Sequence, residues 1–387
     1  MAITILPFTD QGKRSQEAAG VRVLIDTGDL GRGGAERQTV HLASGLIARG
    51  HACTLVVNKS VCSYQDELRS GRVPARILGR DNRFDVRLLG DLLRAVSDFA
   101  PDVVLSVGFS ATLWGRLAAQ IHHVPNVTAE HGTRSELPWK VTIANRVLAG
   151  GTAATVACAR EQVASLVATG NPLDRLVVIH NGVDTSSFYR HREEGLAFRE
   201  RLGLPRDATV VGLVAAHRPE KRHDRFLRVV EGLVSRNTDG VWGCMVGGGA
   251  LFESDEAVAL RSPAAHRLKV VPTQTHMRAV YSALDVAVLV SDSETFPLCF
   301  LEAQACGCAV AGMDTSGVRS TFDPGRSGVL VAQGDTDSLV RELDALAKSP
   351  ETLRAMGEHG RRWVVNHLSL DGMVDQYERL LTRVAGV

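Results

Sequence analysis

Two carboxylates and two cations stand at spacings that suit the binding of one anionic ligand. Glu294 and Glu302 are separated by seven residues, and Arg218 and Lys221 stand in the pattern R-x-x-K. Each pair follows a short β-branched run that predicts a strand. Fixed cations at such a place can stabilise the charge that accumulates on a departing diphosphate without a metal ion. Both patterns also have plainer interpretations, since a glutamate near a helix start favours the helix dipole and R-x-x-K is common on solvated faces.

The residues around Glu294 offer further phosphate ligands. Pro297 suits the first position of a helix, so the amides at this helix start would point toward a bound phosphate. Glu302 would lie about two turns deeper, so that the two carboxylates address one ligand at different points. The expected donor-binding residues of this segment are Glu294, Thr295, Phe296, Pro297, Leu298 and Glu302.

A glycine-rich turn and a histidine follow two other expected strands. The turn G-R-G-G-A-E covers residues 31–36, and Glu36 stands where a dinucleotide fingerprint needs glycine, which disfavours hydride transfer on a nicotinamide. A lone histidine is usually structural, but His131 follows a strand directly, at the end where α/β sheets bind ligands. The sequence contains no G-x-S-x-G nucleophile motif and no His/Asp/Glu set at metal-ligand spacing, so we expect neither a metal nor another cofactor.

The elements that position these residues alternate between strands and helices. The alternation stops near residues 181–184 and then resumes, which predicts two doubly wound α/β domains with parallel sheets and a ligand cleft between them. The predicted divisions are a loose N-terminal tail over residues 1–20, a first domain over 21–185, a second over 186–368, and a final helix over 369–387.

The composition excludes several classes of protein. The 387 residues carry a formal net charge of +1, which excludes a generic nucleic-acid binder. Seven scattered cysteines suggest reduced thiols. The start of the chain does not resemble a signal peptide, and no apolar run approaches the ~20 residues that span a bilayer. These features predict a cytoplasmic protein; its oligomeric state is not indicated.

An arginine-rich segment is the exception to the balanced charge. Glycines and a proline interrupt any continuous helix there, so a solvated loop is the first interpretation, and contact with an anionic acceptor or with the inner membrane face is the second. The arginines concerned are Arg69, Arg72, Arg76, Arg80, Arg83 and Arg87.

Together these motifs resemble the retaining, nucleotide-sugar-dependent glycosyltransferases of family 4, which have the GT-B fold of two Rossmann-like domains. The resemblance runs from about Val21 to the C-terminus. It rests on G-G-x-E at residues 33–36, N-G-V-D at 181–184, R-x-x-K at 218–221 and E-x7-E at 294–302 with its E-A-x-A-C-G continuation.

The resemblance implies a role for each motif. The first domain would bind the acceptor and the second the nucleotide-sugar donor, while the last helix would brace the first domain. Arg218 and Lys221 would bind the donor diphosphate, Glu294 the transferred sugar and Glu302 the ribose. Gly34 joins the implied donor-binding set, and Gly33, Glu36, His131 and Arg134 form the implied acceptor side, with His131 also counted as catalytic beside Arg218, Lys221 and Glu294.

The implied reaction is retaining, metal-independent hexosyl transfer to a hydroxyl, with a UDP-sugar favoured over a GDP-sugar as donor. The acceptor is a saccharide, a lipid-linked molecule or a small molecule, as in the biosynthesis of polysaccharides, glycolipids or natural-product glycosides. Two alternatives are a nucleotide-sugar epimerase of the same architecture and a non-catalytic binding subunit. The sequence departs from the family at Arg222 and Thr295, where glycine is usual, and over residues 315–320.

Overall fold

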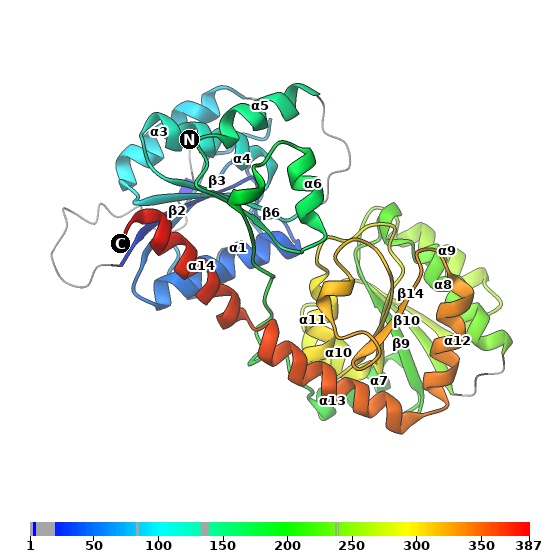
Figure 1. Cartoon of the computed structure of the whole chain (residues 1–387). Helices are drawn as coiled ribbons and strands as arrows, with labels where there is room; N and C mark the ends of the chain where they lie inside the picture. The colour runs from blue at the N-terminus through cyan, green and yellow to red at the C-terminus, as the bar shows by residue number, and fades with distance from the viewer. Residues whose placement is uncertain (1–2, 5–19, 83–84, 133–138, 237, 239) are drawn as a thin grey trace. The chain divides into compact units, whose positions relative to one another are not determined.

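A computed structural model of the protein describes residues 3–4, 20–82, 85–132, 139–236, 238 and 240–387. The chain divides into two compact units: Met1–Asn181 together with Leu370–Val387, and Gly182–Ser369. Each unit is built on its own sheet, and apart from β1 (Ile3–Thr4) all neighbouring strands are parallel (Figure 1). The structure confirms the predicted class of two doubly wound α/β domains.

The N-terminal unit has an eight-stranded sheet in the order β1-β4-β3-β2-β5-β6-β7-β8, with β1 antiparallel to β4 and the other neighbours parallel. Its strands are β1 (Ile3–Thr4), β2 (Arg22–Thr27), β3 (Ala52–Val57), β4 (Ala75–Ile77), β5 (Val103–Val107), β6 (Asn126–Glu130), β7 (Ala154–Ala157) and β8 (Leu176–Val178). Its helices are α1 (Gly34–Ala48), α2 (Gln65–Ser70), α3 (Arg87–Phe99), α4 (Phe109–Ile121), α5 (Trp139–Ala149), α6 (Gln162–Ala168), the 3-10 turn Leu173–Arg175 and α14 (Leu370–Ala385).

Strand β2 shows why this sheet is buried on both faces. Val23 and Ile25 pack into one apolar core, whereas Leu24 packs into another, because successive side chains of a strand point to opposite faces. The first core includes Val374 and Tyr377 of α14, so the last helix completes the N-terminal unit. Figure 1 shows α14 in red beside α1 in blue, at the end of a chain that has passed through the other unit.

The C-terminal unit has a six-stranded, all-parallel sheet in the order β11-β10-β9-β12-β13-β14. Its strands are β9 (Thr209–Val214), β10 (Val241–Val246), β11 (Leu268–Val271), β12 (Val286–Leu289), β13 (Ala309–Met313) and β14 (Gly328–Val331). Its helices are α7 (Arg192–Leu202), α8 (His223–Ser235), α9 (Phe252–Arg261), α10 (Met277–Ala283), α11 (Leu298–Ala305), α12 (Thr336–Ala347) and α13 (Pro350–His367), with 3-10 turns at Pro219–Lys221, Ala265–Arg267 and Arg319–Thr321.

The strand order of the second sheet determines where a ligand would bind. Numbered from β9, the order is 3-2-1-4-5-6, which is that of the Rossmann fold. The chain reverses direction across the sheet between β9 and β12, and open α/β sheets bind their ligands at the carboxyl ends of the two strands at such a point. The loops that follow β9 and β12 carry the R-x-x-K and E-x7-E motifs.

The structure shows strands in two segments of the N-terminal unit that were expected to be loose or looped. Within the predicted loose tail, Ile3 and Thr4 pair with Ile77 and Arg76 of β4, while residues 1–2 and 5–19 lie outside the described residues. The arginine-rich segment is not simply a loop, because β4 of the N-terminal sheet runs through it.

Within the described part of the chain, no helix combines the length and the apolar character that crossing a bilayer requires.

Candidate active site

The loops after β9 and β12 are joined by their backbones. The amide of Asp292 donates a hydrogen bond of 2.8 Å to the carbonyl oxygen of Glu220. Arg225, on the first turn of α8, donates to the carbonyl of Val290 at 2.6 Å and to the Asp292 carboxylate at 2.9 Å. These bonds hold the R-x-x-K loop against the start of the E-x7-E segment.

Lys221 and Glu294 form the central ion pair of the site. The Lys221 Nζ lies 2.7 Å from the Glu294 Oε1, and the hydroxyl of Ser291 donates to the same oxygen at 2.7 Å. The Glu294 side chain is 8% exposed and that of Lys221 23% exposed, so water screens this pair less than a surface pair. The site therefore holds its carboxylate in one orientation before any ligand arrives.

Arg218 is the second cation of the loop and is placed differently. It is exposed, has extended backbone angles (φ −131°, ψ 154°) and comes directly before the 3-10 turn of Lys221. Among the residues that the structure describes, none forms a hydrogen bond or an ion pair with the Arg218 side chain. The loop thus presents one cation paired with Glu294 and one that can bind an incoming anion.

Arg222 explains the first departure from the family pattern. It adopts φ 54° and ψ 53°, the left-handed conformation that costs roughly 1–2 kcal/mol in residues other than glycine, which accounts for glycine being usual here. Its guanidinium contacts the carboxylates of Asp224 at 2.8 Å and Asp292 at 3.2 Å. The contact with Asp292 adds a link between the loops.

The segment after Glu294 differs in detail from the prediction. Pro297 precedes the first helical residue of α11 instead of occupying it, with φ −70° and ψ 111°. The side chains of Phe296, Pro297 and Leu298 are buried, and that of Thr295 is half-buried. The segment can therefore bind a ligand through its backbone more readily than through side chains. The first-turn amides of α11, which have no partner within the helix, begin at Leu298.

Glu302 lies on the second turn of α11 and is 4% exposed. The divergent segment over residues 315–320 is close to the first glutamate, because the amide of Gly317 donates to the carbonyl oxygen of Glu294 at 3.2 Å. The departures in that segment therefore affect the surroundings of the residue assigned to the sugar.

On the N-terminal unit, Gly33 and Gly34 open α1 as expected. A Cβ atom on Gly33 would stand 2.1 Å from a carboxylate oxygen of Glu36, so a side chain at position 33 would displace Glu36. The hydroxyl of Tyr64 donates to the carbonyl of Gly33 at 3.0 Å and holds the turn from the other side. This geometry places the Glu36 carboxylate close to the backbone of Gly33.

His131 follows β6 directly. Burial lowers the pKa of its imidazole to about 4, so the ring is neutral at physiological pH. Its Nδ1 atom has no hydrogen-bond partner among the described residues. The carbonyls of Glu130 and Gly132, on either side of His131, both accept from Gln162 at 2.9 and 3.0 Å, which fixes its backbone. Arg134 lies outside the described residues.

Four of the six arginines of the arginine-rich segment pair with carboxylates of their own chain, and Arg83 lies outside the described residues. Ion pairs join Arg76 to Asp98 at 3.3 Å and Arg80 to Asp91 at 2.8 Å. Others join Arg69 to Asp66 at 3.5 Å and Arg87 to Asp85 at 2.8 Å. Contact with an anionic membrane through this segment stays a prediction, and such contact would have to compete with these pairs.

Sequence reasoning missed Ser291 and Asp292 as parts of the site. Both come within three residues of the end of β12, at the carboxyl end of a strand where ligand-binding residues gather, and that position was the available signal. Ser291 orients the Glu294 carboxylate, and Asp292 joins the two loops through its backbone and its side chain.

The sequence matches two family models that together cover most of the chain. Residues 32–187 match the model described as Glycosyltransferase Family 4, and residues 196–363 match Glycosyl transferases group 1. D-inositol 3-phosphate glycosyltransferase 1 of Catenulispora acidiphila is 28% identical over 321 residues, which are 76% of this chain and 75% of that protein.

Two relatives of higher identity match over a shorter region. D-inositol 3-phosphate glycosyltransferase 2 of C. acidiphila is 32% identical over 48% of this chain and 45% of the relative. D-inositol 3-phosphate glycosyltransferase of Rhodococcus jostii is 31% identical over 53% of this chain and 47% of the relative. The chain thus spans about half the length of these curated relatives.

Solved structures share the fold at low sequence identity. HepE (Alr3699) of Anabaena, crystallised with UDP, has a TM-score of 0.82 at 17% identity, covering 94% of this chain and 100% of that one. Sucrose-phosphate synthase of Thermosynechococcus elongatus has a TM-score of 0.79 at 17% identity, covering 94% and 99%. The two Rossmann-like units define the GT-B fold. Within that class, the chain belongs to the glycosyltransferases of the family 4 type.

Proposed function

We propose that this protein transfers a sugar from a nucleoside diphosphate sugar to an acceptor hydroxyl with retention of the anomeric configuration. The observation that carries the proposal is the pair of loops at the point where the C-terminal sheet reverses direction. One loop supplies the exposed Arg218, and the two loops together supply the Lys221–Glu294 ion pair.

The reaction breaks the bond between the anomeric carbon and the diphosphate oxygen and forms a bond from that carbon to the acceptor oxygen. Arg218 and Lys221 stabilise the negative charge on the departing diphosphate. The acceptor's hydroxyl proton passes to the leaving phosphate, so no carboxylate is needed as the base. No carboxylate acts as a nucleophile either. The products are the glycoside and a nucleoside diphosphate.

Glu294 and Glu302 divide the rest of the donor between them. Glu294 binds hydroxyls of the transferred sugar, since the Ser291 hydroxyl and Lys221 fix its carboxylate at the end of β12. Glu302, on the second turn of α11, binds the ribose. Gly34 and residues 295–298 complete the proposed donor side.

A UDP-sugar is the favoured donor. The support is the family resemblance and the fold neighbours that were crystallised with UDP and with UDP-glucose. The relatives named D-inositol 3-phosphate glycosyltransferases make a phosphorylated cyclitol one acceptor worth testing beside saccharides, lipid-linked molecules and other small molecules. The acceptor-side roles of Gly33, Glu36, His131 and Arg134 stay predictions.

The test is to incubate the protein with UDP-glucose and a panel of acceptors and to determine the products by NMR. We expect release of UDP together with an α-linked glucoside, with the rate unchanged in excess EDTA because the two cations replace a metal. A β-linked product would contradict retention, and activity that EDTA abolishes and magnesium restores would contradict metal independence.

The same experiment separates the two alternatives. A nucleotide-sugar epimerase would convert the donor sugar in the absence of any acceptor. A non-catalytic binding subunit would bind the donor and release no UDP with any acceptor or with water.

A further inference from the structure

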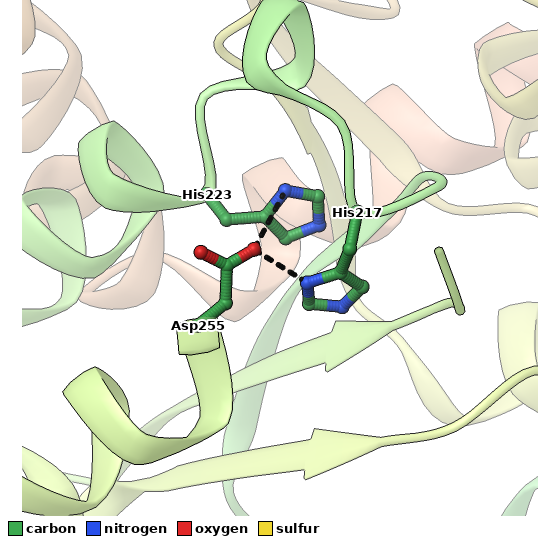
Figure 2. Close-up of side chains that lie close together, drawn as sticks. All are labelled: His217, His223 and Asp255. Atoms are coloured by element: carbon green, nitrogen blue, oxygen red, sulfur yellow. Dashed lines mark hydrogen bonds and ion pairs between the residues drawn. The ribbon is translucent and has the colours of Figure 1, made fainter. Parts of the chain in front are cut away.

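The two histidines that flank the R-x-x-K loop meet beneath it. His217 comes directly before Arg218, and His223 begins α8, two residues after Lys221. Their rings stack with centroids 3.7 Å apart and planes 20° from parallel. Asp255, on the first turn of α9, completes the group, and Figure 2 shows its carboxylate directed at both rings.

The three side chains each bring one ligand atom to within 4.8 Å of the other two. The Asp255 Oδ2 lies 2.7 Å from the Nδ1 of His217 and 3.8 Å from the Nδ1 of His223. Four ligands at about 2.05 Å in a tetrahedron stand about 3.3 Å from one another, a value between these two distances. Because the two rings stack with planes only 20° from parallel, each ring would have to turn before both nitrogen lone pairs could point at one ion.

Unsatisfied ring nitrogens point to a missing ligand. The side chains of His217 and His223 are 0% and 2% exposed. Among the described residues, the Nε2 of His217 and both ring nitrogens of His223 have no hydrogen-bond partner. Buried polar atoms normally have hydrogen-bond partners. Three ring nitrogens without one, in a single pair of rings, therefore need an explanation. A cation bound by the three side chains would give the His223 Nδ1 its partner and would take the place of the hydrogen bond between the His217 Nδ1 and Asp255, while the two Nε2 atoms would keep their present surroundings.

The backbone around His217 is fixed before any ion arrives. Its amide donates to the carbonyl of Gly248 at 2.9 Å, and its carbonyl accepts from the amide of Leu251 at 3.2 Å. Gly249 has φ 149°, and a Cβ atom there would stand 2.6 Å from the carbonyl oxygen of His217, so only glycine allows this contact. The edge of His217 also packs against Phe252, with centroids 5.0 Å apart. A ligand held in this way loses little freedom on binding a metal.

We propose that His217, His223 and Asp255 bind a divalent transition metal of the Zn²⁺ class. Two imidazoles and one carboxylate are a donor set that suits Zn²⁺, Co²⁺ or Ni²⁺, whereas Mg²⁺ and Ca²⁺ prefer oxygen ligands. Asp255 is 22% exposed and gives the ion its route of entry, and a water molecule would fill the fourth position. Figure 2 shows the second oxygen of Asp255 turned away from the rings, so the carboxylate binds through one oxygen.

The ion would be structural. It would fasten both ends of residues 217–223 to α9, and it would thereby hold the backbone that carries Arg218 and Lys221. The proposed transfer reaction has no step at this ion. The metal site itself does not depend on the proposed function. Only the role of the ion in holding a diphosphate-binding loop rests on that function.

The test is to strip the full-length, tag-free protein of metal and titrate it with Zn²⁺ against a chromophoric chelator, with Mg²⁺ in a parallel titration. We expect one Zn²⁺ per chain and a rise in Tm on binding. His223→Asn and Asp255→Asn should each weaken Zn²⁺ binding at least about 100-fold and remove the rise in Tm. His276→Asn, which changes an exposed histidine of the same unit, should bind Zn²⁺ like the wild type.

Circular dichroism shows whether each variant is folded. If His223→Asn does not fold, Asp255→Asn at its partly exposed position carries the test. Absence of stoichiometric Zn²⁺ binding, or equal binding by wild type and Asp255→Asn, would overturn the proposal. Because the readout is metal binding and not sugar transfer, a negative result here leaves the proposed function standing, and a failure of sugar transfer leaves this site standing.

Discussion

The Lys221 Nζ lies 2.7 Å from the Glu294 Oε1, although the two residues are 73 positions apart in the sequence. The charge of Lys221 is therefore balanced before a donor binds. A diphosphate that approaches Lys221 has to share it with Glu294 or displace that carboxylate. The pair consequently links diphosphate binding to the position of the group assigned to the sugar.

Glu294→Gln tests this link. The substitution removes the carboxylate charge, so Lys221 becomes fully available to the diphosphate. We expect the affinity for UDP, measured by isothermal titration calorimetry, to stay the same or rise up to about tenfold, while kcat for transfer falls by roughly 10²–10⁴. Glu342→Gln, which removes an exposed carboxylate on α12, is the control and should change neither value. A loss of UDP affinity in Glu294→Gln would mean that Glu294 does not compete for Lys221.

Two substitutions at Arg222 separate the cost of its left-handed backbone from the contribution of its ion pairs to stability. Arg222→Gly removes the cost of the left-handed conformation together with the contacts to Asp224 and Asp292, whereas Arg222→Ala removes the contacts and keeps the cost. We expect the glycine variant to be more stable than the alanine variant by roughly 1 kcal/mol in urea denaturation. Equal stabilities would show that the loop changes its conformation once the arginine is gone.

The buried carboxyl group of Asp26 should make the stability of the N-terminal unit depend on pH. It lies in β2, it is 0% exposed, and neither carboxylate oxygen has a hydrogen-bond partner among the described residues. Burial raises the pKa of Asp26 to about 7 from its usual 3.8, so between these values the folded protein holds a proton that the unfolded chain has lost. This contribution to stability is present at low pH and is lost as the pH rises through 7.

The measurement for Asp26 is urea denaturation of the wild type and of Asp26→Asn at pH 5, 6.5 and 8. Asparagine cannot ionise, so the stability of the variant relative to the wild type should increase from pH 5 to about pH 7 and level off above it. A difference that is constant across this range would show that Asp26 does not titrate on folding.

The sequence predicted the architecture well because the alternation of apolar strands with amphipathic helices is a local signal. It predicted poorly where the assignment of strand or loop depends on a single short element. The three residues of β4 stand among arginines, so nothing in their neighbourhood distinguishes a buried strand from a loop. Pro297 illustrates the limit at helix ends, since a proline suits both the first helical position and the residue before it.

The contacts of the site depend on packing between distant segments. R-x-x-K and E-x7-E were visible as motifs, but the pairing of Lys221 with Glu294 follows from the neighbouring positions of β9 and β12. The cluster of His217, His223 and Asp255 was missed for the same reason. Two histidines six residues apart were a weak signal, and the third member comes from another helix.

The most direct test of the donor site is the dissociation constant of UDP for the wild type, Arg218→Ala, Lys221→Ala and a matched control, Arg236→Ala, at the far end of α8. A charge-assisted contact to phosphate is worth about 1.5–3 kcal/mol, so each loop variant should weaken binding by roughly 10- to 100-fold, and the control should bind like the wild type. If Arg218→Ala and Lys221→Ala both bind UDP as tightly as the wild type, these residues do not hold the diphosphate and the proposed site is wrong.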